Sequence, residues 1–370
     1  MLILRIKANK IKMPIDLRTQ QLAKLIVDYS VFVKKGENVI ISGSTEAQEF
    51  IVALYKEVIL KGAHPLLRVR IPGLNNFFYK YANKEQIEKF PDYFDYMVKN
   101  AQKYIGISTE TNTRELTSCD PKKITEREKI VHSISDYVCN GKPKIYRVTV
   151  GFPCMALAQE AEMDLTEYEN FVYSSCLQDW EKISKKINKI ADKFRRGKQV
   201  HLIGENVDLK FEIQGNKLVV DDGKENMPGG EIFMAPVRES LQGWIKFEYP
   251  AIRNGKEITG IYLKFENGKV IEAKASKNED FLKKMLETDE NSSYVGEFGI
   301  GMNPKINRFT KDLLFDEKIG GTIHLALGMA YKENGGGNDS AIHWDIVKDM
   351  SHARIVLDGK TLQKNGIWKI

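Results

Sequence analysis

The sequence predicts an α/β protein of two domains, with a partly parallel sheet in the N-terminal domain and a mixed α+β C-terminal domain. Two features of the pattern lead to this prediction. A strand, a helix and a second strand follow one another over residues 38–69, and after residue 197 the chain changes to short strands separated by tight turns. The length of 370 residues also suits two domains.

The first strand-helix-strand unit is built from a clear succession of patterns. Residues 38–42 are mostly apolar and predict a buried strand, while Thr45 and Gln48 have the spacing of a capping box that begins a helix. Residues 65–69 then resume an extended pattern. Two strands joined by a crossover helix are normally parallel, so we expect a parallel pair here.

Residues 75–145 carry many aromatic side chains between alternating charges. Such rings stack on bases in some nucleic-acid-binding proteins, but this segment has no basic stripe, so we expect them to pack in a core. Further on, Thr166 and Glu169 predict the cap of a long helix that ends near residue 197. We therefore place the domain boundary near residue 200, which divides the chain into residues 1–199 and 200–370.

Composition excludes several classes of protein. The 56 basic and 50 acidic residues are interspersed and give a net charge of only +6, which does not indicate a nucleic-acid partner. No apolar run is long enough for a membrane helix or a signal peptide, and the four cysteines form no close pair, so we expect reduced thiols in a cytoplasmic protein. Residues 1–12 are expected to be an upstream start-site artefact or a frayed tail.

Two histidines lie on predicted strands of the C-terminal domain. In residues 340–347, alternation sends His343 and Asp345 to one face and apolar side chains to the other. In residues 321–328, His324 lies between the small Thr322 and Ala326, which leave space beside it. Each histidine alone could be satisfied by a backbone carbonyl, but together with Asp345 they favour a metal site.

Two glutamates complete the candidate set. Glu231 follows a Pro-Gly-Gly turn at the mouth of a strand, and Glu297 lies among three glycines that allow close backbone approach. A glutamate beside glycine is usually a solvated loop charge. Glu231 and Glu297 are candidate metal ligands only because His324, His343 and Asp345 occur in the same part of the chain. Five such ligands exceed the need of one tetrahedral ion, which indicates two ions, or one ion and a general base.

Four segments, residues 226–236, 296–304, 315–331 and 338–347, closely resemble the M29 family of metalloaminopeptidases. The resemblance implies a two-metal site in which Glu231, Glu297, His324, His343 and Asp345 are the ligands, with zinc, cobalt or manganese as the ions. It also implies catalytic roles for Glu297 and Tyr331, peptide substrates with a free N-terminus, and a homodimer. Which glutamate bridges the ions and which group moves the proton stay open.

Tyr331 lies seven residues beyond His324, at a strand end, where its phenol could hydrogen-bond a tetrahedral oxyanion or simply pack. A rival prediction is a single-iron ring-cleaving dioxygenase, because His324, His343 and Asp345 alone satisfy the facial triad of two histidines and one carboxylate. The Glu231 and Glu297 motifs favour the peptidase.

Overall fold

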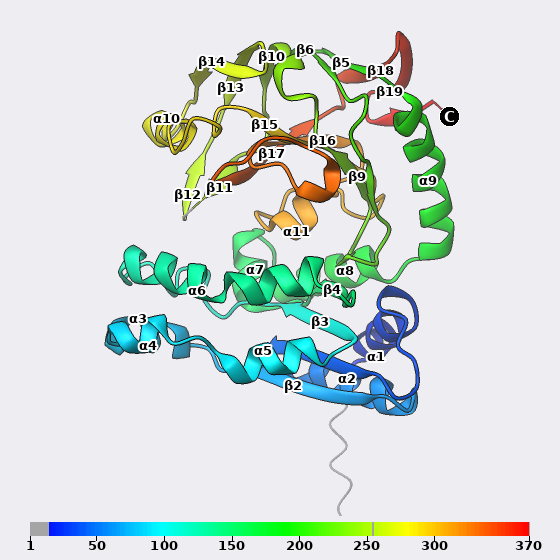
Figure 1. The fold of residues 1–370 in the computed structure, drawn as a ribbon. Coiled ribbons are helices and arrows are strands. Elements are labelled where there is room, and N and C mark those ends of the chain that lie inside the picture. Colours follow the sequence, from blue (N-terminus) through cyan, green and yellow to red (C-terminus); the bar gives the residue numbers. More distant parts are fainter. Residues whose placement is uncertain (1–14, 254, 370) are drawn as a thin grey trace, which may run out of the picture.

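The computed structural model describes residues 15–253 and 255–369. The expectation for residues 1–12 therefore falls outside the described residues. Figure 1 shows two halves, one above the other, with the long helix α9 running up one side from the lower half to the upper. None of the described helices combines the length and the apolar character needed to span a bilayer.

The lower half is built on a five-stranded sheet in the order β2-β1-β3-β4-β8, with every neighbouring pair parallel. The predicted parallel pair is confirmed, since residues 38–44 of β1 align with residues 64–70 of β2. The strands are β1 (Asn38–Ser44), β2 (His64–Arg70), β3 (Lys103–Ser108), β4 (Tyr146–Gly151) and β8 (Asn226–Met227).

The α-helices of the first 196 residues, among those the structure describes, are α1 (Leu17–Leu25), α2 (Gln48–Leu60), α3 (Leu74–Tyr81), α4 (Lys84–Glu88), α5 (Asp92–Lys99), α6 (Pro121–Asn140), α7 (Met155–Glu160), α8 (Leu165–Cys176) and α9 (Trp180–Arg196). The last of them, α9, packs its apolar face into the core of the upper half. The expected capping box at Thr45 is wrong, because the Ser44 hydroxyl accepts the capping hydrogen bond and a short 3₁₀ turn, Thr45–Ala47, precedes α2.

The helix expected from Thr166 to residue 197 is in fact two helices. Asp164 caps α8 and Asp179 caps α9, each through a side-chain oxygen that accepts a backbone N–H. Between them, the Trp180 indole N–H donates to the Cys176 carbonyl and the Gln178 amide donates to the Ser175 carbonyl. These side chains satisfy carbonyls that a continuing helix would have used, so the helix ends there.

The expectation that the aromatic residues of 75–145 pack in a core is wrong for several of them. Phe77 is 59% exposed and Tyr93 is 94% exposed, while Phe77 stacks on Tyr81 on the surface of α3. Helix α3 buries no residue at all, because it is a short helix on the outside of the molecule.

The upper half contains two antiparallel sheets that share one core. The larger has the order β14-β13-β10-β6-β5-β18-β19-β20, and its strands are β5 (Gln199–Gly204), β6 (Val207–Glu212), β10 (Gln242–Lys246), β13 (Tyr262–Glu266), β14 (Lys269–Lys274), β18 (Ala353–Leu357), β19 (Lys360–Lys364) and β20 (Ile367–Trp368). Strands β11 (Ala251–Arg253) and β12 (Lys256–Ile258) form a separate antiparallel pair.

The smaller sheet has the order β17-β16-β15-β9-β7, and it carries the candidate residues. Its strands are β7 (Val219–Asp221), β9 (Glu231–Met234), β15 (Val295–Gly301), β16 (Thr322–Gly328) and β17 (His343–Asp349). Helix α10 (Glu279–Leu286) packs near β14 and β12, and the short helix α11 (Leu313–Asp316) follows β15 in the chain. Helix α11 lies between the two halves (Figure 1). The predicted α/β fold with a partly parallel N-terminal sheet and a mixed C-terminal region is confirmed.

Candidate metal centre

Strand alternation places the candidate residues on one face of the β17-β16-β15-β9-β7 sheet. Ala326 lies between Glu297 on β15 and Asp345 on β17, so its methyl group leaves space between the two carboxylates. The opposite face belongs to the hydrophobic core, where residues such as Leu325 and Trp344 are at most 2% exposed. The core face fixes the register, because a slip of one residue would turn the polar side chains into the core.

Gly299 makes room for the histidine on the neighbouring strand. It pairs with His324 across β15 and β16, and a Cβ atom at this glycine would lie 1.9 Å from the imidazole Nε2. Any other residue would displace the ring, so the glycine is required by contact rather than by backbone conformation.

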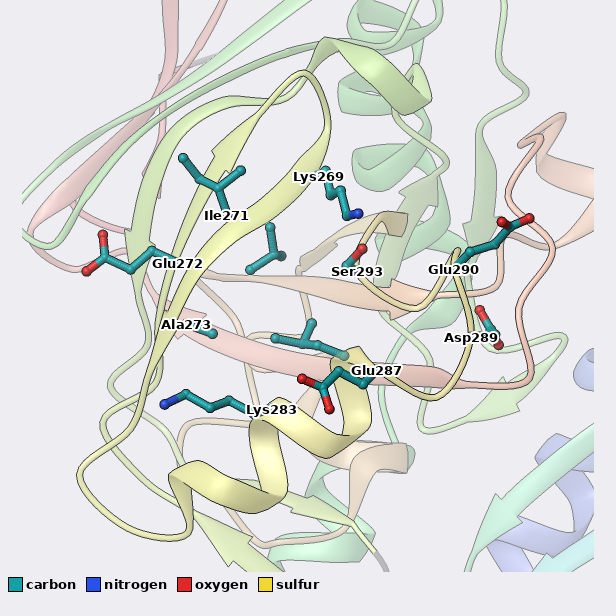
Figure 2. Close-up of a pocket in the computed structure, with 11 residues that line it drawn as sticks. Lys269, Ile271, Glu272, Ala273, Lys283, Glu287, Asp289, Glu290 and Ser293 are labelled. Atoms are coloured by element: carbon teal, nitrogen blue, oxygen red, sulfur yellow. The ribbon is translucent and has the colours of Figure 1, made fainter.

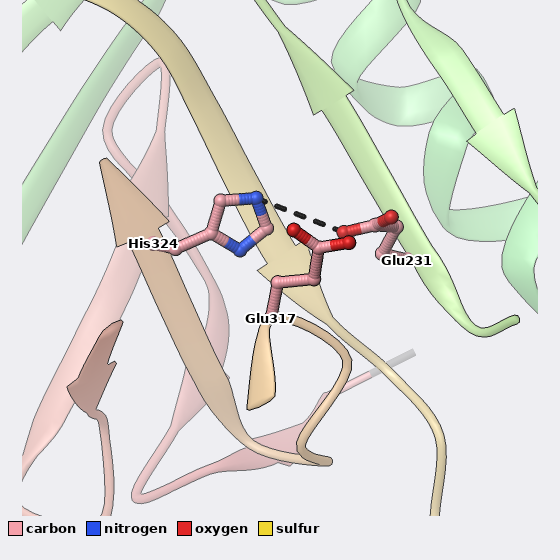
Figure 3. A group of neighbouring side chains, drawn as sticks. All are labelled: Glu231, Glu317 and His324. Atoms are coloured by element: carbon pink, nitrogen blue, oxygen red, sulfur yellow. Dashed lines mark ion pairs between the residues drawn. The ribbon is translucent and has the colours of Figure 1, made fainter. Parts of the chain in front are cut away.

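A first group of ligand-type side chains consists of Glu231, Glu317 and His324 (Figure 3). One potential ligand atom of each lies within 4.8 Å of the others. The three side chains come from β9, from the residue after α11 and from β16, and they point toward one another. The His324 Nε2 lies 3.7 Å from Oε2 of Glu231, and the histidine is fully buried.

A second group consists of Glu297, His343 and Asp345, again with ligand atoms within 4.8 Å of one another. The Nδ1 of His343 is 2.8 Å from the Met329 carbonyl and donates to it, so Nε2 presents its lone pair to the group, 3.4 Å from Oδ2 of Asp345. The two groups adjoin, because Oε1 of Glu297 lies 3.4 Å from Nε2 of His324.

Several buried polar atoms of these residues have no hydrogen-bond partner among the described residues. They are Oε2 of Glu231, Oε2 of Glu297, Oδ1 of Asp345 and Nδ1 of His324. A buried polar atom without a partner costs free energy, so such a concentration of them calls for a ligand. Carboxylate and imidazole donors in two groups of three fit divalent cations, and three protein ligands leave a coordination position open in each.

Lys318 supplies the positive charge closest to the first group. Its Nζ lies 3.1 Å from Oε1 of Glu231, contacts Glu317 and is 4.0 Å from Oδ2 of Asp221. Burial alone would lower the pKa of Lys318, but the three carboxylates outweigh it and raise that pKa above the ordinary lysine value. Lys318 is therefore a permanent cation that holds these carboxylates together.

The pKa values of the buried glutamates and of His324 are shifted in the directions expected for an acidic, buried site. Burial raises the pKa of Glu231 well above its usual value and also raises that of Glu297. Burial alone would lower the pKa of His324, but the hydrogen bond with Glu297 and the charges of Glu231 and Asp345 raise it to about 9. Without a metal, the site therefore keeps protons that a bound cation would replace.

Tyr331 lies beside the second group. Its ring centroid is 4.7 Å from that of His343, and the two rings are tilted by 48°. The residue is 39% exposed, and burial of its inner part raises the pKa of its phenol. The hydroxyl therefore stays protonated at neutral pH and can donate a hydrogen bond.

The structure brings together all five residues expected as ligands, and it adds Glu317. No strand alternation marks this glutamate, since it follows the short helix α11 rather than lying on a strand. The sequence does contain a signal, because the charged triplet Asp316-Glu317-Lys318 stands between apolar residues. In the structure the lysine of this triplet is fully buried.

Known proteins resemble this chain over nearly its whole length. The sequence model of the family described as thermophilic metalloprotease (M29) matches residues 16–368. Aminopeptidase AmpS of Bacillus subtilis is 27% identical, with 94% of this chain and 97% of that protein covered. Aminopeptidase T of Thermus thermophilus is 25% identical, with 95% and 98% covered.

Two solved structures share the fold. Wild-type AmpT from Thermus thermophilus matches with a TM-score of 0.83 at 22% identity, over 95% of this chain and 99% of that one. The 2,5-dihydroxypyridine dioxygenase from Pseudomonas putida matches with a TM-score of 0.64 at 14% identity, over 95% and 96%. At these identities the structures support the fold, whereas the family match covers the chain from the first sheet to the last strand and confirms the resemblance found in the sequence. The chain belongs to the M29 family of thermophilic metalloproteases.

Proposed function

We propose that this chain is a metal-dependent aminopeptidase that removes the N-terminal residue of peptides by means of a water activated by two divalent metal ions. The observation that carries the proposal is the division of six ligand-type side chains into two adjoining groups of three. Glu231, Glu317 and His324 would hold one ion, and Glu297, His343 and Asp345 the other. When bound, a pair of ions such as zinc, cobalt or manganese supplies a nucleophilic water at neutral pH and polarises the scissile carbonyl.

The residues around the two groups have separate tasks. The Met329 carbonyl fixes the ring of His343, so that its Nε2 faces the group. Glu297 of the second group lies 3.4 Å from Nε2 of His324 in the first, and we propose that it accepts the proton of the attacking water. Tyr331 would donate its phenolic hydrogen to the oxyanion that develops on the scissile carbonyl.

The acidic character of the site also explains how it would recognise the N-terminus of a peptide substrate. A free α-amino group is positively charged or can ligate a metal, and both properties match a buried cluster of four carboxylates with two imidazoles. An internal peptide bond offers no such group. We therefore propose peptides with a free N-terminus as substrates, with no nucleic-acid or membrane partner.

The wider organisation of the protein is also a proposal. We propose that residues 1–199 form the N-terminal α/β domain and that residues 200–370 form the metal-binding domain, since all six ligand candidates lie in the second range. A homodimer in the cytoplasm is expected from the family resemblance and the cysteine pattern.

A single-iron dioxygenase that uses His324, His343 and Asp345 is the second candidate, because a dioxygenase shares the fold. The grouping of the side chains favours the peptidase. His324 belongs with Glu231 and Glu317, whereas His343 and Asp345 belong with Glu297.

A metal titration separates the two candidates. We expect the purified protein to lose hydrolysis of amino-acyl chromogenic substrates in a chelator, to regain it with cobalt, zinc or manganese, and to approach two metals per chain by elemental analysis. The variants His343→Ala and Glu297→Gln should stay folded by circular dichroism while activity falls by several orders of magnitude. Saturation at one iron with oxygen consumption on an aromatic substrate would instead support the dioxygenase, and activity in metal-free protein would refute both mechanisms.

A further inference from the structure

A small hollow adjoins the second ligand group. It has a volume of about 130 Å³ and lies where β17 meets β11, with His343 and Asp345 in its wall. Val347 lies two residues beyond Asp345 on the same face of β17, opposite His324 in the sheet register, and extends this wall along the strand. The other four ligand candidates do not line the hollow, so it borders the site on the β11 side and is not the space between the ligands themselves.

The far walls of the hollow are held in place by packing. Ala251 is 3% exposed, and the ring of Phe309 stacks on Tyr249 with centroids 5.0 Å apart. Arg253 Nη1 donates to the His343 carbonyl at 2.9 Å, which ties β11 to the edge of β17. Walls of this kind form a pocket before a ligand arrives, as small-molecule sites usually do.

The charged groups that border the hollow already have partners. Asp316 accepts hydrogen bonds from the Thr310 N–H at 2.7 Å and from its hydroxyl at 2.9 Å. Lys311 pairs with Glu162 at 3.1 Å and with Glu257 at 3.6 Å. Apolar side chains, those of Ala251, Phe309 and Val347 among them, supply part of the remaining lining.

The volume sets the size of the occupant. An apolar cavity of about 150 Å³ holds a benzene molecule. The hollow is slightly smaller, so an aliphatic side chain the size of leucine or methionine fits and an indole ring does not. Glycine and alanine would leave most of the apolar wall uncovered, and this wall would then contribute no binding free energy.

We infer that this hollow receives the side chain of the substrate's N-terminal residue and that it selects medium-sized aliphatic residues. The inference rests on the proposed aminopeptidase function. In such a substrate one carbon atom carries the α-amino group, the scissile carbonyl and the side chain. With the first two at the ligand groups, the side chain must enter a space that borders those groups, and the hollow beside His343 and Asp345 is such a space.

The test compares rates between substrates within one enzyme preparation. Dipeptides X-Ala, with glycine, alanine, leucine, methionine or tryptophan as X, are assayed for kcat/KM with metal added. We expect leucine and methionine to exceed alanine by roughly 10- to 200-fold, the range that apolar pockets achieve for small differences in side-chain size. Ala251→Leu fills the hollow and should reduce the leucine-to-alanine ratio by about tenfold or more.

A matched control adds the same side chain at a different site. Ala273 borders a separate hollow beside α10, shown in Figure 2, which contains none of the ligand candidates. Ala273→Leu should leave the leucine-to-alanine ratio unchanged. Phe309→Leu supplies a second test that does not overfill the core, and it should increase the rate for larger X residues relative to leucine.

Binding of the product amino acid gives a readout that does not depend on turnover. L-leucine should raise the thermal unfolding temperature of the wild-type protein more than L-alanine does, and Ala251→Leu should remove that difference. An unchanged leucine-to-alanine ratio in the folded variants would overturn the inference. The inference would also fail if the variants instead changed the relative rates for dipeptides Ala-X, in which the second residue varies. If the wild-type protein with metal hydrolyses none of these peptides, the proposed function itself fails.

Discussion

At the scale of single residues, Tyr331 separates metal binding from catalysis. Tyr331→Phe should lower kcat by roughly 10²- to 10³-fold, as expected for the loss of one oxyanion donor, with metal content unchanged. The phenol lies beside His343 without being a ligand candidate, which is why the two properties should separate. Tyr262→Phe, on a strand of the other sheet, serves as the control. A normal rate in Tyr331→Phe would make this residue a packing residue only.

Glu317 provides a second test at this scale. Glu317→Gln keeps the size of the side chain and removes one of the three donors of the first group. We expect metal content to fall from about two toward about one per chain, with loss of activity. The exposed Glu287→Gln is a matched control that should change neither quantity. If Glu317→Gln retains two metals of wild-type affinity, Glu317 serves only as a partner of Lys318.

The pKa of His324 predicts how metal uptake depends on pH. Its folded pKa is about 9, above the ordinary value of 6.5, so the metal-free protein carries a proton on His324 at neutral pH. A cation needs the neutral ring, so uptake should release protons, and metal affinity should rise as pH increases toward about 9. Titration calorimetry in buffers of different ionisation enthalpy measures the release. Equal proton counts at pH 7 and above pH 9.5 would contradict this assignment.

The same pKa has a consequence for folding. A raised histidine pKa stabilises the metal-free protein fully below about pH 6.5, and that contribution is lost as pH rises through about 9. The raised pKa values of Glu231 and Glu297 act in the same direction at lower pH, because their folded forms also hold protons more tightly. The melting temperature of the chelated protein should therefore fall over this range, with a smaller fall in His324→Gln.

At the scale of elements, the glycines of β15 determine how closely the strands can approach. Gly299→Ala would place a methyl group 1.9 Å from Nε2 of His324, so the ring must move out of the first group. We expect loss of metal with the sheet still formed, measured by elemental analysis and circular dichroism. Gly337→Ala is the matched control, because nothing lies within 4 Å of a Cβ atom there. Full metal content in Gly299→Ala would show that the histidine is dispensable.

Strand periodicity explains how much of the site the sequence could predict. His324, His343 and Asp345 alternate with core residues, so their shared face follows from a period of two. Glu317 follows a four-residue helix and has no such pattern, and its position depends on how α11 packs between the halves. Likewise, the break between α8 and α9 depends on side chains that donate hydrogen bonds to backbone carbonyls. The spacing of apolar residues carries no information about such hydrogen bonds.

At the scale of the whole molecule, the halves are joined beside the site. The short strand β8 pairs with β4 of the lower sheet, and after three intervening residues the chain enters β9 at Glu231. Phe315 of α11 packs against Phe171 of α8, with ring centroids 5.4 Å apart, just before Glu317. Two connections therefore run from the lower half directly into the first ligand group.

This arrangement predicts where metal binding should slow amide hydrogen exchange. Bound ions would link β9, β15, β16 and β17 to the residue after α11, and a ligand that binds only the folded state at about 100 times its Kd adds roughly 2.7 kcal/mol of stability. We expect strong protection in these strands, weaker protection in β4 and β8 through the two connections, and none in α3 or α5, which supply no ligand. Exchange measured by mass spectrometry with and without chelator tests this pattern. Protection spread evenly over both halves would mean that the protein unfolds only as one unit, and protection confined to α3–α6 would place the metal elsewhere.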